Sequence, residues 1–139
     1  MSDAQFLAGD FKDRNVILYG NADTNAAWET LLGKSPVQVK RGSVKIGERE
    51  VQGDDLAILF VRPRPGSDTA SVGVVAGTGL PGMRLTERLP YFTSGVHFPD
   101  VTVIGSEMLS RGVAGVRVAG FFGNDWTVEN GEFAWREEK

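Results

Sequence analysis

The chain has 139 residues, of which 41% are hydrophobic and 24% charged, with a formal net charge of −3 and no cysteine. This composition is typical of a globular domain, and the negative charge argues against non-specific nucleic-acid binding. The lack of cysteine excludes disulfides and thiolate chemistry. Because no apolar run reaches the ~18 residues of a membrane helix, we expect one soluble α/β domain over residues 1–139, with its compartment left open.

The first third of the chain predicts an N-terminal segment, a strand, a helix and a hairpin. Residues 1–13 are mostly polar, which indicates a segment that docks loosely on the core. Residues 15–20 form a continuous apolar run, as in a strand buried on both faces. Residues 26–33 place apolar side chains on one helical face. Residues 37–53 alternate between apolar and polar side chains, which favours an antiparallel β-hairpin.

The rest of the chain repeats the buried-strand pattern. Two helices are expected between the later strands, over residues 83–91 and 106–111. The tail that follows the last strand is polar apart from Phe133 and Trp135. The apolar runs that predict buried strands lie at residues 56–61, 72–76, 101–104 and 116–122.

Buried strands that alternate with helical segments are typical of a three-layer α/β fold, in which helices cover both faces of a mostly parallel sheet. We therefore predict a flavodoxin-like or Rossmann-like sheet. Residues 37–53 would form an antiparallel β-hairpin inserted into it.

Such a sheet predicts where a ligand would bind. Ligands of open parallel sheets collect at the carboxyl ends of the strands, and four of those ends are polar or glycine-rich here. Parallel strands would gather the four ends into one crevice; the alternative is that asparagine and glycine simply form loops. The predicted ligand-binding residues are Asn21, Asp23, Thr24, Asn25, Arg62, Gly77, Thr78, Gly79, Arg84, Asn124, Asp125 and Trp126.

One of these loops also resembles a dinucleotide-binding fingerprint. Gly77, Gly79 and Gly82 have its spacing, and glycines there let backbone amides approach a pyrophosphate at a helix N-terminus. Pro81 departs from the pattern because it removes one amide donor. Arg84 could hold an anion at the same turn. An alternative function is therefore a small nucleotide- or anion-binding enzyme domain.

Catalytic signals are weak. His97 is the single histidine, and no Gly-x-Ser-x-Gly elbow accompanies Ser94, which lies three residues away. A structural role is favoured for His97, and no catalytic residue, metal ligand or cofactor is predicted. Phe121, Phe122, Trp126 and Trp135 suggest a third function, an interaction or oligomerisation module, although core packing is the simpler explanation for these rings.

Four stretches carry a family resemblance: residues 15–25 (NVILYGNADTN), 53–66 (GDDLAILFVRPRPG), 74–84 (VVAGTGLPGMR) and 119–126 (AGFFGNDW). They resemble a C-terminal region of large bacterial α/β-hydrolases of the prolyl-oligopeptidase-like or esterase-like kind, and the likeness covers residues 15–135. In such proteins the catalytic serine, acid and histidine lie in the preceding hydrolase domain, and this sequence has no matching positions. The resemblance thus implies a non-catalytic accessory or ligand-binding α/β domain, with that hydrolase domain as its partner and a secreted or periplasmic parent protein.

Overall fold

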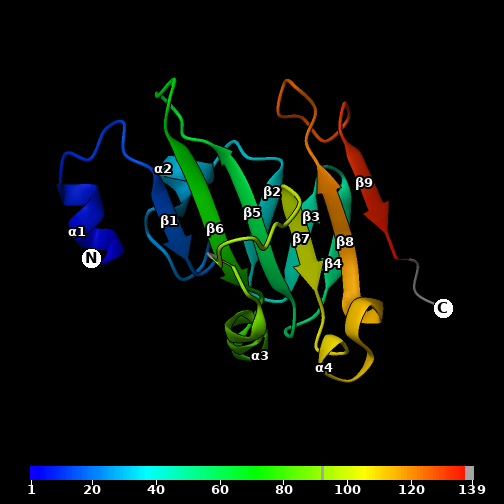
Figure 1. Cartoon of the computed structure of the whole chain (residues 1–139). Coiled ribbons are helices and arrows are strands. Elements are labelled where there is room, and N and C mark those ends of the chain that lie inside the picture. Colours follow the sequence, from blue (N-terminus) through cyan, green and yellow to red (C-terminus); the bar gives the residue numbers. More distant parts are fainter. Residues whose placement is uncertain (92, 137–139) are drawn as a thin grey trace.

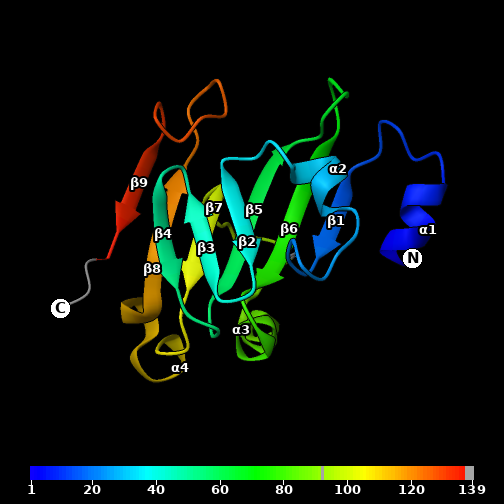
Figure 2. The ribbon, with the colours of Figure 1, turned by 180° about the vertical axis from the view of Figure 1, so that it is seen from behind.

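A computed structural model describes residues 1–91 and 93–136 of the chain. The described strands form two sheets that pack face to face (Figures 1 and 2). The larger sheet contains, in spatial order, β1 (Val16–Tyr19), β6 (Ser71–Gly77), β5 (Ala57–Pro63), β7 (Val101–Ile104), β8 (Val116–Phe121) and β9 (Glu132–Trp135). The smaller sheet contains β2 (Val37–Lys40), β3 (Ser43–Ile46) and β4 (Arg49–Gln52).

The larger sheet is mostly antiparallel, so the prediction of a mostly parallel Rossmann-like or flavodoxin-like sheet was wrong. β1 and β6 run parallel, whereas the pairs β6–β5, β5–β7, β7–β8 and β8–β9 are all antiparallel. A strand covered on both faces is a continuous apolar run whichever way its neighbours point, so the five runs located strands without giving their directions. The connection at residues 64–70 is shorter than the dozen or more residues that a parallel crossover needs.

The main core lies between the two sheets. The segment expected as a β-hairpin forms the three antiparallel strands of the smaller sheet, and the inward valine and isoleucine side chains of β2 and β3 are fully buried. Helix α2 (Trp28–Leu32) extends this layer beside the smaller sheet (Figure 2). Its Trp28 packs edge-on against Phe60 of β5, with ring centroids 6.2 Å apart. The predicted helical face of residues 26–33 is therefore confirmed.

The opposite face of the larger sheet has a thinner cover. It consists of α3 (Leu80–Leu85), α4 (Met108–Arg111) and the chain between α3 and β7, which crosses in front of the central strands (Figure 1). Leu59, Val75 and Ile104 are buried beneath this cover. The outer strands extend beyond it, so Ile17 and Tyr19 of β1 remain 47% and 49% exposed.

Both chain ends contain an element that the sequence analysis missed. The N-terminal segment forms α1 (Asp3–Ala8), which begins with a capping box between Ser2 and Gln5. The polar tail contains β9, whose Phe133 and Trp135 pack on the main core between outward-facing polar or small residues. Within residues 1–91 and 93–136, no helix has the length and apolarity to cross a membrane.

Candidate functional site

The structure divides the predicted crevice between two ends of the larger sheet. β1 and β6 are parallel, so Asn21 and Thr78 follow their strands at one end. β5 and β8 run the other way, as the pairing of Phe60 with Val101 and of Val101 with Gly120 shows, and they carry Arg62 and Trp126 to the opposite end. A single crevice formed by all four loops was therefore a wrong expectation, because it required parallel strands.

At the first end, the polar side chains hold the loop itself together. Asn21 is 4% exposed, and its Nδ2 donates to the carbonyl oxygen of Gly77 at 2.9 Å. The hydroxyl of Thr24 accepts a hydrogen bond from the Asn21 amide at 2.9 Å. Asp23 Oδ2 accepts one from the amide of Arg41, also at 2.9 Å. These bonds tie the loop after β1 to β6 and to the smaller sheet.

The glycine-rich loop after β6 is packed against the chain that enters β5. The amide of Thr78 donates to the carbonyl of Leu56 at 3.0 Å, and the amide of Gly82 donates to that of Asp54 at 3.2 Å. A Cβ on Gly79 would stand 2.7 Å from the same Asp54 carbonyl oxygen. The amides of Thr78 and Gly82, which a dinucleotide fingerprint would offer to a pyrophosphate, are therefore bonded within the chain, and Gly79 permits this close packing.

At the second end, Arg62 joins β5 to the loop after β8. Its Nη1 donates to the carbonyl of Trp126 at 2.6 Å, and its guanidinium lies 5.1 Å from the centroid of the Phe122 ring. Burial in this aromatic setting lowers the pKa of Arg62. Phe122 is buried and packs on Trp126, whereas Phe121 points to the other face and is 56% exposed. The four rings considered for an aromatic patch thus do not share one surface.

The remaining predicted ligand-binding residues lie on two separate elements: Asn124 and Asp125 share the loop after β8, and Arg84 lies on α3. Asp125 accepts hydrogen bonds from the side chains of Thr127 and Asn130, and these bonds lower the pKa of Asp125. Asn124 is exposed in the same loop, and Arg84 is exposed on α3.

The single histidine lies on the surface. His97 is exposed in the segment before β7. In the part of the chain that the structure describes, no group of three or more His, Asp or Glu side chains is placed to hold a metal ion.

A groove that the sequence analysis did not predict lies between α1 and β1. Its volume is about 870 Å³, and it is bounded by the N-terminal segment, β1 and the loop that leads into α2. Phe6 and Phe11 line one wall, where their rings stack at 5.7 Å. Ile17 and Tyr19 of β1 line the other wall, and Leu31 of α2 adds apolar surface. We call this space the β1 groove.

The N-terminal wall of the β1 groove is fixed by long-range contacts. Asp3 Oδ2 accepts a hydrogen bond from the amide of Ala26 at 2.6 Å, and this bond lowers the pKa of Asp3. Arg64, beyond the end of β5, donates from Nη1 to the carbonyls of Phe11 at 2.5 Å and Arg14 at 2.7 Å. The groove is thus held open by partners more than 20 positions away in the sequence. Such contacts cannot be found from local patterns.

The other wall is the free edge of a strand. β1 is the outermost strand of its sheet, and the amide of Gly20 donates to the carbonyl of Val75 on β6. Backbone groups alternate along a strand, so Leu18 also faces β6, while the peptide groups of Ile17 and Tyr19 face the groove. The bond from Asn25 Nδ2 to the Tyr19 carbonyl, 3.0 Å long, agrees with this direction.

This geometry is suited to binding a strand. An exposed strand edge offers amide donors and carbonyl acceptors to an extended chain, and neighbouring apolar pockets receive its alternate side chains.

Comparisons of the chain with protein-family models, curated proteins and solved structures found no match.

Proposed function

We propose that this chain is a non-catalytic accessory domain of a hydrolase and that it binds an extended polypeptide segment of that hydrolase in the β1 groove. The observation that carries the proposal is the free edge of β1 beside a groove of about 870 Å³. The link to a hydrolase comes from the resemblance of residues 15–135 to a region that follows the catalytic domain in prolyl-oligopeptidase-like and esterase-like proteins.

The chemistry of the groove favours a peptide over a small polar ligand. The outward peptide groups of Ile17 and the outward amide of Tyr19 are spaced to pair with an added strand, whereas the Tyr19 carbonyl already accepts from Asn25. Phe6, Phe11 and Leu31 supply apolar surface for side chains on one face of that strand. Added strands gain affinity from main-chain hydrogen bonds and specificity from such pockets.

A proline substitution tests the binding mode. Ile17→Pro removes an amide that faces the groove and leaves the neighbouring amides that face β6. Peptides selected from a random 12-residue display library on the wild-type chain should bind Ile17→Pro about fivefold or more weakly, the effect of losing one hydrogen bond. They should also protect the amides of Ile17 and Tyr19 from hydrogen exchange.

A matched variant controls for general surface effects. Phe121→Ser alters an exposed apolar side chain on β8, far along the sheet from β1, and should leave peptide affinity within about twofold. Equal affinity for the wild type and for Ile17→Pro would overturn binding along β1.

Separately, the isolated chain should not hydrolyse chromogenic esters or peptides. Turnover that co-purifies with the chain through several columns would overturn the non-catalytic assignment.

A further inference from the structure

A second groove, of about 540 Å³, lies where the smaller sheet meets the C-terminal strands of the larger one. It is lined by Arg49 of β4, Arg117 of β8 and Arg136, which follows β9. Trp135 and Val51 supply apolar surface between the arginines. We call this space the arginine groove, and it is separate from the β1 groove, which lies at the opposite edge of the sheet.

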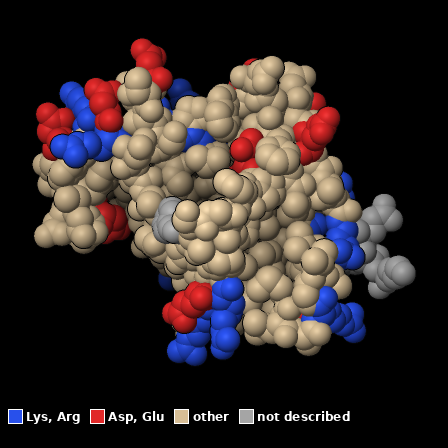
Figure 3. Space-filling model, in the orientation of Figure 1, with Lys and Arg blue, Asp and Glu red and all other residues tan. Residues whose placement is uncertain are grey.

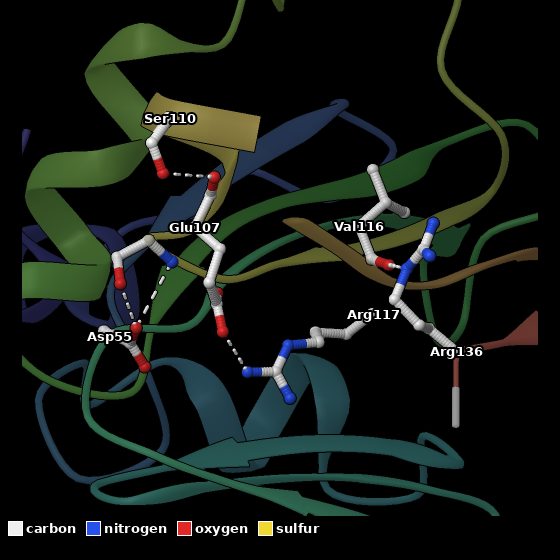
Figure 4. Close-up of polar contacts among 7 residues, drawn as sticks. Asp55, Glu107, Ser110, Val116, Arg117 and Arg136 are labelled. Carbon is white, nitrogen blue, oxygen red and sulfur yellow. Dashed lines mark hydrogen bonds and ion pairs between the residues drawn. The ribbon is translucent and has the colours of Figure 1, made fainter. Parts of the chain in front are cut away.

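Each arginine is held in place by its own contact. The Arg49 guanidinium lies over the Trp135 ring, 3.9 Å from its centroid. Arg117 Nη2 pairs with Glu107 Oε1 at 2.6 Å (Figure 4). Arg136 donates from Nε to the carbonyl of Val116 at 2.9 Å (Figure 4). The guanidinium groups are therefore positioned before any ligand arrives, which reduces the entropy lost on binding.

The Arg136 side chain retains unused donors. A guanidinium has five N–H donors. Arg136 spends one on Val116 and a second on the carbonyl of Val113, at 3.1 Å from Nη2. Three donors, five minus two, make no hydrogen bond to residues 1–91 or 93–136 and can serve a ligand. Stacking on Trp135 uses the face of Arg49 and leaves its N–H edge available.

The side chains that line the groove are mostly basic. Arg49, Arg117 and Arg136 carry three positive charges and Glu50 one negative charge, so the lining sums to +2, and Glu107 offsets part of it through its ion pair with Arg117. Figure 3 shows basic side chains beside the end of β9. A positive concave site of this kind attracts anions and concentrates them.

We propose that the arginine groove binds a small molecule through an oxyanion group, either a phosphate or a carboxylate. Guanidinium groups recognise both through paired, charge-assisted hydrogen bonds. Trp135 and Val51 would contact the uncharged part of the same molecule. The residues come from three strands that the two-sheet packing brings together, so the site depends on the fold and not on a local motif.

Calorimetric titration of the full chain with inorganic phosphate and with citrate, at matched ionic strength, tests this site. Saturable binding of phosphate assigns a phosphate group, and binding of citrate alone assigns a carboxylate; either supports the proposal. Arg49→Met keeps an apolar side chain over Trp135 and removes the charge, and it should weaken binding about tenfold or more. Arg136→Gln should also weaken anion binding.

A nearby arginine provides the matched control. Arg111 is exposed on α4 and does not line the groove, so Arg111→Gln should change affinity by less than about twofold. Two results would overturn the proposal: no heat beyond that of sodium chloride with either anion, or Arg49→Met binding as tightly as the wild type. Neither result bears on peptide binding in the β1 groove, which uses other residues.

Discussion

Substitution of Gly82 by alanine distinguishes a packing role for the glycine-rich loop from a phosphate-binding role. A Cβ at this position would stand 2.2 Å from the carbonyl oxygen of Leu56, and 2.8 and 2.9 Å from its carbonyl carbon and nitrogen. Favourable non-bonded contacts are about 3.5–4.0 Å long, so α3 would have to retreat from the sheet. That movement also breaks the bond from the Gly82 amide to Asp54.

The opposing contributions can be compared. Overpacking costs about 1–3 kcal/mol, and the lost hydrogen bond adds about 1 kcal/mol. The higher helix propensity of alanine returns about 1 kcal/mol. Gly82→Ala should therefore lower the free energy of unfolding by about 1–3 kcal/mol. If Gly82 served only to admit a phosphate, the higher helix propensity of alanine would be the only contribution, and Gly82→Ala would raise the free energy of unfolding.

Urea denaturation followed by tryptophan fluorescence measures whether Gly82→Ala lowers or raises the free energy of unfolding. Gly73→Ala on β6 is the control, because a Cβ there meets its nearest atoms at 3.8 and 4.0 Å, which is ordinary contact. It should leave the urea midpoint unchanged or raise it. A Gly82→Ala variant at least as stable as the wild type would refute the packing argument.

Three further outcomes follow from the structure. Val16→Pro removes an amide that faces β6 and should cost about 1–3 kcal/mol of unfolding free energy, whereas Ile17→Pro, on the free edge, should cost less than about 1 kcal/mol; equal urea midpoints would contradict the assigned edge. The Ser106 hydroxyl donates to Asp55 and lowers the pKa of that carboxyl below its usual 3.8. Because the pKa of Asp55 is lower in the folded state, its ionised form stabilises the fold above the unfolded-state pKa, and this stability is lost as the pH falls through the folded-state pKa. Asp55→Asn should therefore lower the free energy of unfolding at about pH 6 and make that free energy depend less on pH in the acid range. Trp28→Ala removes a side chain that is 2% exposed and should cost about 3–5 kcal/mol in the same urea assay; a loss below about 1 kcal/mol would show that α2 does not pack into the core.

Local patterns predicted the strands that have continuous apolar runs, but they did not predict helix α1 or strand β9. All five apolar runs became strands of the larger sheet. Burial on both faces explains the continuous apolar runs of the central strands β5 and β7, whereas β1 leaves Ile17 and Tyr19 half exposed. The capping box at Ser2 and Gln5 could have indicated α1, and the alternation at residues 132–135 could have indicated β9. Both signals are short and are supported by distant contacts, such as the bond from Ala26 to Asp3.

The four predicted loops do not meet in one crevice, although two hydrogen bonds join residues of different loops. Asn21 does contact Gly77, because β1 and β6 are the one parallel pair among the described strands, and Arg62 does contact Trp126. The two pairs lie at opposite ends because β5 returns directly after a short loop. The connection at residues 64–70 was the available signal, since its length allows an antiparallel return and excludes a parallel crossover.

The sequence by itself determined where the strands with apolar runs lie and which face of helix α2 is buried, since these properties depend on side-chain polarity and local spacing. Only the tertiary structure decided strand direction, the free edge of β1 and the meeting of Arg49, Arg117 and Arg136. Those features depend on contacts between segments tens of residues apart, and hydrophobic burial has no direction that could specify them in advance.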